Sequence, residues 1–245
     1  MKLYHGTTNK LRRDILREGI KPRALTGGKG QWENAPSREG HVYLTTTYAP
    51  YFAVQAMTDI QKDKMLLIEV DSDRLEKRNL YPDEDFVEQF ARMRDEYDKN
   101  KTMLERTAAV DVEAERGRWH QSIRGLGNCS HRGIIEPWQI TRMAIVGLKH
   151  QFAVAHASID PTISIHNHQY CGEKYRQLIA WVFGDREMLP DALDGGIVDL
   201  MDPLARRSEE RKEGSIKRCV AYSQKFRELS RLRMGITVFD VNRGQ

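Results

Sequence analysis

The sequence predicts an α+β fold, and three observations favour this class. Short apolar or β-branched segments such as 41–45 and 65–70 are typical of strands, and amphipathic segments between them are typical of helices. Strands and helices alternate unevenly along the first 150 residues, as expected for an α+β domain. At 245 residues and 40% hydrophobic content, the chain is long enough to bury a sizeable core.

The clearest elements lie near the N-terminus. Residues 1–5 predict a short strand, and a helix follows over 10–18, which Asn9 caps and Gly19 ends. Residues 24–40 are rich in glycine, proline and serine and predict a loop. The further predicted elements are a strand over 41–45, a helix over 48–62, a strand over 65–70, a helical piece over 119–123, and strands over 133–135 and 143–146.

The chain divides into two predicted regions. Residues 1–148 form the α+β domain, and the highly charged stretch 83–125 is a helical insertion within it. Residues 149–245 form a mainly helical C-terminal region. Its predicted elements are helices over 173–183, 191–201 and 204–233 and a last strand over 234–241.

Composition excludes several classes of protein. No apolar run approaches the roughly 20 residues that span a bilayer, and the first residues lack the apolar segment of a signal peptide. Cys129, Cys171 and Cys219 are odd in number and widely spaced, which favours reduced thiols and a cytoplasmic location. The net charge of +4 permits an anionic partner without requiring one.

Two short motifs carry the functional signal. His5, Gly6 and Thr7 lie at the exit of the first predicted strand, of which His5 is the last residue. Tyr43 lies on the strand over 41–45, and Tyr51 lies on the helix that follows. Two tyrosine rings in this arrangement are placed to enclose one flat ligand between them.

Together these motifs resemble the ADP-ribosyltransferase superfamily, in its diphtheria-toxin and poly(ADP-ribose) polymerase branch, over roughly residues 1–148. The resemblance implies a split antiparallel sheet and NAD as co-substrate. It also implies that His5, Gly6 and Thr7 bind the ribose and the nicotinamide amide, with the histidine as a hydrogen-bond donor. Tyr43 and Tyr51 would stack on the nicotinamide ring, at about 0.5–2 kcal/mol each. Their spacing is shorter than in the polymerases.

The resemblance also implies a glutamate at the start of a late strand, where it binds the ribose and stabilises the positive charge at C1′. If that strand is 133–135, its start holds His131 and Arg132, and Glu136 falls at its far end. These three residues are the catalytic candidates. Glycine-rich residues 27–30 would lie over the NAD diphosphate.

The implied function is transfer of ADP-ribose from NAD to a macromolecule, with RNA or DNA favoured over protein. A bacterial or phage toxin fits this activity, with an antitoxin or regulatory protein as a further partner and no role for a membrane. The first alternative is an NAD-dependent RNA 2′-phosphotransferase, a related activity that does not need the glutamate. The second is a non-catalytic binding module on the same fold.

Simpler roles remain open for each residue. His5, Tyr43 and Tyr51 are also common as core residues, and Glu136 before a proline is typical of a strand end. Glu113 and Glu115 imitate a catalytic Glu-x-Glu pair within a charged helix. His166, His168 and Cys171 lack the second ligand pair that a zinc site needs, so we expect no metal.

Overall fold

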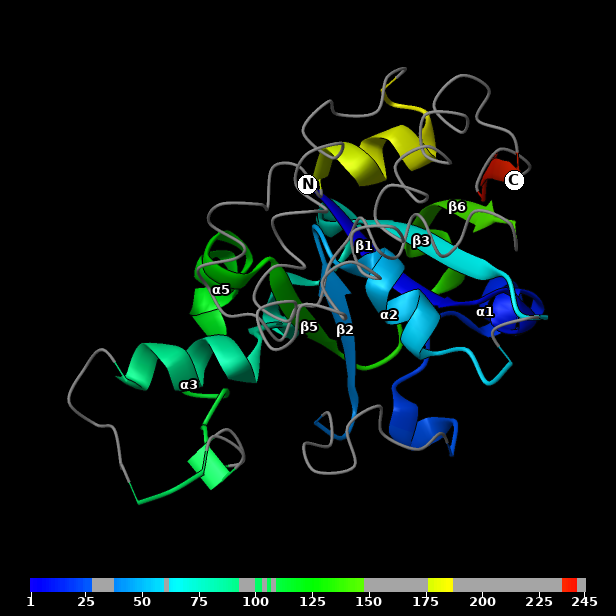
Figure 1. Cartoon of the computed structure of the whole chain (residues 1–245). Coiled ribbons are helices and arrows are strands. Elements are labelled where there is room, and N and C mark those ends of the chain that lie inside the picture. Colours follow the sequence, from blue (N-terminus) through cyan, green and yellow to red (C-terminus); the bar gives the residue numbers. More distant parts are fainter. Residues whose placement is uncertain are drawn as a thin grey trace, which may run out of the picture.

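The protein is built around one antiparallel sheet of seven strands (Figure 1). The computed structural model describes residues 1–27, 38–59, 62–92, 100–102, 105–106, 109–147, 176–186 and 235–241. The strand order is β4-β5-β2-β1-β3-β6-β7, and every neighbouring pair is antiparallel. The predicted α+β class is therefore confirmed.

Short helices connect the strands. The strands are β1 (Lys2–Thr8), β2 (His41–Thr45), β3 (Met65–Asp71), β4 (Leu80–Pro82), β5 (Asn128–Arg132), β6 (Ile140–Val146) and β7 (Ile236–Asp240). The α-helices are α1 (Arg12–Glu18), α2 (Ala49–Gln55), α3 (Glu84–Arg92) and α5 (Trp119–Leu126), and residues 176–183 are also helical. The 3-10 helices are η1 (Asn9–Leu11), η2 (Arg23–Leu25), η3 (Ser72–Arg74), η4 (Lys77–Asn79), η5 (Arg116–Arg118) and η6 (Pro137–Gln139).

The sheet separates two apolar clusters, one on each face. On one face, Ala53 of α2 and Trp181 of the 176–183 helix pack in the same cluster as Tyr4 of β1. On the other, Ile15 of α1 and Ile123 of α5 belong to the cluster beneath the central strands. Alternation of side chains along each strand explains why neighbouring residues enter different clusters.

The sheet is divided between β1 and β2. β1 pairs with β3 along its whole length, from Lys2↔Asp71 to Thr8↔Met65, whereas Tyr4↔Thr45 is the one register pair that joins it to β2. β2 in turn pairs with β5 along all of its length. The two halves, β4-β5-β2 and β1-β3-β6-β7, thus share one register pair and diverge beyond it.

Several predicted boundaries change. β1 continues to Thr8, so His5, Gly6 and Thr7 lie inside a strand and not at its exit, because β3 pairs with all three. Thr8, not Asn9, is the N-cap: its side chain accepts a hydrogen bond from the backbone N–H of Lys10 at 3.4 Å, and η1 precedes α1. The predicted helix over 48–62 is shorter, since α2 ends at Gln55.

The predicted strand over 133–135 is wrong. The strand is β5, which begins five residues earlier at Asn128 and ends at Arg132. Gly133 follows with a φ of +90°, a conformation that L side chains rarely adopt, and this turns the chain out of the strand. Ile135 then forms an isolated bridge with Ile20 instead of joining the sheet.

Part of the C-terminal region belongs to the same core. β7 is the edge strand next to β6, and the 176–183 helix packs over the β1-β3-β6 side of the sheet, above the strands in Figure 1. The helices predicted over 191–201 and 204–233 lie outside the described residues. No helix within the described ranges is both long and apolar enough to cross a membrane.

Candidate functional site

His5 is held at the point where β1 and β2 diverge. Its Nδ1 lies 3.0 Å from the backbone oxygen of Tyr43. A carbonyl oxygen only accepts, so Nδ1 carries the proton and donates it, and Nε2 keeps a free lone pair. Burial lowers the pKa of His5 against the effect of this hydrogen bond, and the positive charge of Arg23 lowers it further. At neutral pH the His5 ring is therefore neutral, and its Nε2 is a hydrogen-bond acceptor.

Gly6 has a structural reason to be glycine. A Cβ built on it would lie 1.8 Å from the backbone oxygen of Ala49 and 2.8 Å from the backbone nitrogen of Ala53. The first turns of α2 thus pack directly on the β1 backbone, and any side chain would displace the helix. Thr7, the third residue of the motif, is buried.

The Tyr43 side chain points toward the start of α3. Its hydroxyl accepts a hydrogen bond from the backbone N–H of Arg38 at 2.8 Å and donates one to Oε1 of Glu84. Burial and the Glu84 carboxylate raise the pKa of Tyr43, so the hydroxyl stays protonated. This hydrogen bonding fixes the direction of the ring.

Tyr43 and Tyr51, the two rings predicted to enclose a ligand, have separate partners in the structure. The Tyr51 ring contacts the ring of Phe52 edge-on, with centroids 5.6 Å apart. Within the described part of the chain, no ring contact joins Tyr43 to Tyr51. Enclosure of a nicotinamide ring by these two residues stays a prediction.

Glu84 is a residue that the sequence reasoning missed. Its Oε2 is buried and has no hydrogen-bond partner, while its Oε1 holds Tyr43. Burial raises the pKa of Glu84 and of its neighbours Asp83 and Asp85, with that of Asp85 reaching about 6. The run Asp83-Glu84-Asp85 directly after Pro82 was the available signal, but a charged run is more often solvated.

Asn128 is a second residue that was missed. It begins β5 and pairs with Thr45 of β2, the residue that joins β2 to β1. Asn128 is only 8% exposed, and its Oδ1 is buried without a hydrogen-bond partner. The hydroxyl of Ser122 donates to its backbone oxygen at 2.7 Å, which fixes the start of the strand. Asn128 therefore holds an unused acceptor in the strand next to β2.

The three predicted catalytic residues lie at the end of β5 and just before η6. His131 is buried, burial lowers its pKa, and its Nδ1 has no partner. Arg132 is exposed, and its Nη1 donates to Oε1 of Glu113 at 3.0 Å. Glu136 is exposed, and its backbone N–H donates to Oε1 of Gln139 at the start of η6. Among the described residues, no hydrogen bond or ion pair joins the side chain of any of the three to His5 or Tyr43.

A polar network fixes the segment before η5 to the sheet. The His41 ring lies 3.0 Å from the Ser130 hydroxyl and contacts the Tyr81 ring at 5.0 Å. The Tyr81 hydroxyl donates to Oε2 of Glu113 at 3.1 Å. Burial lowers the pKa of His41 to about 4. Glu113, the first acid of the Glu-x-Glu pair, is thus committed to Tyr81 and to nearby arginines.

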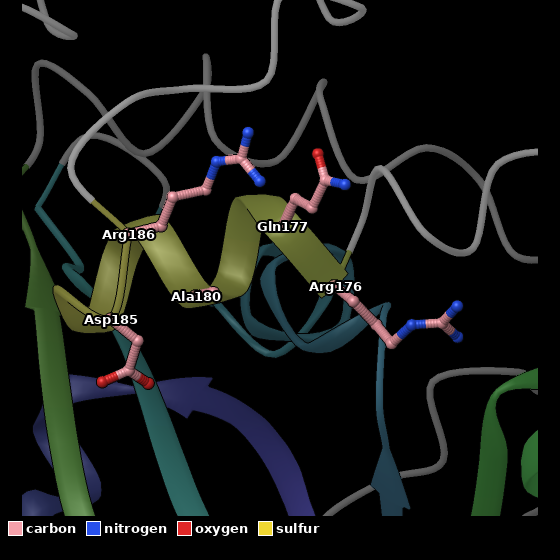
Figure 2. Close-up of a pocket in the computed structure, with 5 residues that line it drawn as sticks. All are labelled: Arg176, Gln177, Ala180, Asp185 and Arg186. Atoms are coloured by element: carbon pink, nitrogen blue, oxygen red, sulfur yellow. The ribbon is translucent and has the colours of Figure 1, made fainter.

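A separate hollow of about 320 Å³ lies on the 176–183 helix, away from these residues. Arg176, Gln177, Ala180, Asp185 and Arg186 line it (Figure 2). Asp185 points toward the strands, and Gln177 and Arg186 point the other way (Figure 2). Asp185 bonds Arg142 and Lys2, so it ties the helix end to the sheet.

No three histidine, cysteine or acidic side chains of the described ranges are placed to share a metal ion. His166, His168 and Cys171 lie outside these ranges, as do residues 28–30 of the glycine-rich loop. Comparison of the chain with family models, curated proteins and solved structures gives no match. The chemistry of the site therefore rests on its own geometry.

Proposed function

We propose that this protein is an NAD-dependent ADP-ribosyltransferase that breaks the nicotinamide–ribose bond and transfers ADP-ribose to a macromolecule. The observation that carries the proposal is the position of His5, held on the Tyr43 carbonyl where the two halves of the sheet diverge. The sequence resemblance implies a split antiparallel sheet, a histidine at the end of one strand and a tyrosine on another. The division of the sheet between β1, which carries His5, and β2, which carries Tyr43, supports the proposal.

His5 would bind the ribose of NAD as an acceptor. Its Nε2 accepts a hydrogen bond from a ribose hydroxyl, which reverses the donor role expected from the sequence. The bond to Tyr43 fixes both the tautomer and the direction of the ring, so little ordering is needed when the ribose arrives. A single hydrogen bond of this kind contributes about 1 kcal/mol.

Asn128 would take the place that the resemblance gives to glutamate, because it begins the late strand next to β2. The unpartnered Oδ1 fits a second ribose hydroxyl. An amide carries no charge, so it does not stabilise positive charge at C1′ as a carboxylate does. Glu84 is the acidic group of this proposal. Its pKa is raised by burial, which suits it to take a proton from the macromolecule that receives ADP-ribose.

The test is transfer of label from NAD that carries it on the adenylate. The protein is incubated with labelled NAD and, separately, with RNA, DNA and a protein lysate, and label on each polymer is measured. The proposal expects label on one polymer, with RNA or DNA ahead of protein, and loss of labelling in His5→Ala. His120→Ala, a change of an exposed histidine on α5, is the matched control and should label normally. No label on any polymer would reject the transfer.

The neutral Asn128 favours a second candidate, an NAD-dependent RNA 2′-phosphotransferase, because that activity does not need the glutamate. RNA carrying an internal 2′-phosphate, incubated with NAD, separates the two functions. Loss of the 2′-phosphate without retained ADP-ribose on the RNA supports the second candidate. Binding of NAD with no consumption supports a non-catalytic module.

A further inference from the structure

The hollow on the 176–183 helix has a lining that is mainly polar (Figure 2). Its volume of about 320 Å³ lies at the lower end of the range of small-molecule sites in proteins, about 300–1,000 Å³. Arg176 and Arg186 contribute two guanidiniums to the lining, and Gln177 contributes an amide. The proposed function uses none of these residues, so the hollow needs an explanation of its own.

The helix presents this polar face because its other face packs on the sheet. Arg176, Gln177 and Ala180 have the spacing of residues on one helix face. The remaining side chains of the helix are buried in the apolar cluster that includes Tyr4 of β1: Leu178, Ile179, Trp181, Val182 and Phe183. Because the helix is fixed by this packing, its polar face has a defined position.

The end of the helix brings Arg186 beside the same face. Gly184 has a φ of +81°, and its backbone N–H donates to the oxygen of Trp181 at 3.1 Å. The N–H of Asp185 donates to the oxygen of Ala180 at 2.8 Å. A glycine in this conformation commonly ends a helix with such hydrogen bonds. The chain therefore turns back at Gly184, and Arg186 lines the hollow together with Ala180.

Asp185, the acidic residue of the lining, has two cationic partners within the chain. Its carboxylate points toward the strands (Figure 2) and accepts hydrogen bonds from Arg142 at 2.8 and 2.7 Å and from Lys2 at 2.7 Å. Arg186 points the other way (Figure 2). The negative charge of Asp185 is thus balanced by the sheet, and the lining favours an anionic ligand.

The guanidiniums have enough donors for a ligand. Arg176, Gln177 and Arg186 also interact with other residues of the chain. Each arginine carries five N–H donors, so an interaction within the chain leaves donors for a further acceptor. Two parallel N–H groups are sufficient for a bidentate hydrogen bond to a phosphate group.

We propose that this hollow binds a phosphate group of a nucleotide, either a free nucleotide or a unit of an RNA or DNA strand. Arg176 and Arg186 would donate to the phosphate oxygens, because the planar guanidinium fork matches their spacing. Gln177 would bind the sugar or the base, since its amide both donates and accepts. The anion site does not depend on the proposed function. A strand bound there would be the acceptor of that function.

The experiment measures binding of inorganic pyrophosphate, AMP, adenosine and a single-stranded RNA by calorimetry. The proteins are the full chain, Arg176→Ala, Arg186→Ala and Arg13→Ala. Arg13 is exposed on α1 and is the matched control, because its removal also takes away one positive charge. We expect each change in the hollow to weaken pyrophosphate and AMP roughly tenfold or more, and to affect adenosine little. Arg13→Ala should bind all four ligands as the unchanged chain does.

Gln177→Glu tests the same site without removing an arginine. The change keeps the size of the side chain and suits a helix, but it places a negative charge in the lining. Binding of pyrophosphate and AMP should weaken, and urea unfolding of the variant should match that of the unchanged chain. Unweakened binding of both anions by Gln177→Glu would contradict the proposal.

The RNA measurement distinguishes the two sources of the phosphate. RNA affinity that falls with salt and is reduced in Arg176→Ala and Arg186→Ala supports a strand as the ligand. Binding of AMP without binding of RNA supports a free nucleotide. The proposal is overturned if no ligand binds, if AMP binds no more tightly than adenosine, or if both variants bind pyrophosphate and AMP as the unchanged chain does.

The outcomes also separate this inference from the proposed function. If AMP binds through Arg186 but no label passes from NAD to any polymer, the anion site stands and the proposed function is rejected. If label passes to a polymer while Arg176→Ala and Arg186→Ala bind AMP and pyrophosphate normally, the inference is wrong and the proposed function stands.

Discussion

At the scale of single residues, the His5 ring shows how a backbone contact sets chemistry that the sequence leaves open. The sequence predicted that His5 binds a ribose, but the donor role expected of it depended on an unknown tautomer. The Tyr43 carbonyl decides the tautomer, because it accepts the Nδ1 proton and leaves Nε2 as the acceptor. No sequence pattern encodes which strand neighbour supplies that carbonyl.

This assignment predicts the pH dependence of NAD binding. The pKa of His5 is lowered, so the neutral ring persists below the ordinary value of 6.5, and affinity should be flat from pH 8 to about 6.5. As pH falls further, through the lowered pKa, Nε2 gains a proton and no longer accepts a hydrogen bond. Calorimetric affinity should then fall, and His120→Ala should follow the same curve. Affinity that rises as pH falls would contradict the acceptor role.

Asn128 and Glu84 were not predicted, and for different reasons. Asn128 matters because it begins β5, and the sequence placed that strand five residues later. Glu84 matters because its Oε2 is buried without a hydrogen-bond partner, whereas a charged run such as Asp83-Glu84-Asp85 is more often solvated. Both signals are absences of a partner, and only the folded chain displays them.

At the scale of elements, the contact of α2 with β1 explains the glycine of the His-Gly-Thr motif. Gly6→Ala should destabilise the fold by about 2 kcal/mol or more, because its Cβ meets backbone atoms of Ala49 and Ala53 that cannot rotate away. Gly117→Ala is the matched control: a Cβ there meets nothing within 4 Å. Urea unfolding of the two variants should differ clearly. Equal stability would mean that α2 is not packed on β1 as described.

The start of α3 carries a second prediction at this scale. Burial raises the pKa of Asp85 from 3.8 to about 6, with Glu84 and Glu88 adding to the shift. A carboxyl whose pKa is raised on folding destabilises the fold when it is ionised, so the cost is full above about pH 6 and disappears below about 3.8. Asp85→Asn should therefore stabilise the protein by about 1–2 kcal/mol at pH 8. Urea unfolding of Asp85→Asn at pH 8 and pH 4 checks this prediction. An equal increase in the free energy of unfolding at both pH values would show that ionisation of Asp85 is not the cause.

Strand prediction succeeded where local composition carried the signal. The segments that became β2, β3 and β7 are apolar or β-branched, and their predicted ranges agree with the structure to within a few residues. β5 has the sequence NCSHR, which favours a strand weakly, and it is extended because β2 and β4 pair with it on both sides. In the apolar segment 133–135, only Ile135 is buried, and it bridges Ile20 instead of pairing within the sheet.

At the scale of the whole molecule, Arg142 joins parts of the chain that are far apart in sequence. Its guanidinium bonds the buried Glu69 of β3 and Asp185 beside the 176–183 helix, and Lys2 of β1 bonds the same Asp185. The network therefore ties the C-terminal region to the central strands. The sequence could not predict it, because it depends on which strands become neighbours of β1.

Removal of Arg142 should destabilise the whole fold. Arg142→Leu leaves Glu69 buried with only Lys2, at 3.4 Å, as a cationic neighbour, and we expect a loss of about 2–4 kcal/mol in urea unfolding. Arg17→Leu, which removes the exposed ion pairs of Arg17 with Asp14 and Glu18, should change stability little. A loss no larger than in Arg17→Leu would show that the network does not stabilise the attachment of the C-terminal region to the central strands.

The same network predicts how the stability of the fold decreases at low pH. The hydrogen bond from Arg142 is the largest cause that lowers the pKa of Asp185 from 3.8 to about 2. The ionised Asp185 therefore stabilises the fold fully at pH values above 3.8. This stabilisation should be lost as pH falls from about 3.8 through about 2. Stability measured between pH 5 and pH 2 should fall less steeply in Asp185→Asn than in the unchanged chain, and parallel curves would contradict this origin.

The proposed role of His5 is to bind NAD for cleavage of its nicotinamide–ribose bond. The most direct test is release of nicotinamide from NAD by the full chain, by His5→Ala and by His120→Ala, each supplied with the polymer that accepts label. The account predicts release by the unchanged chain and by His120→Ala, and loss of release in His5→Ala with the fold intact. Equal release by all three variants, or no release by the unchanged chain with any polymer, would contradict it.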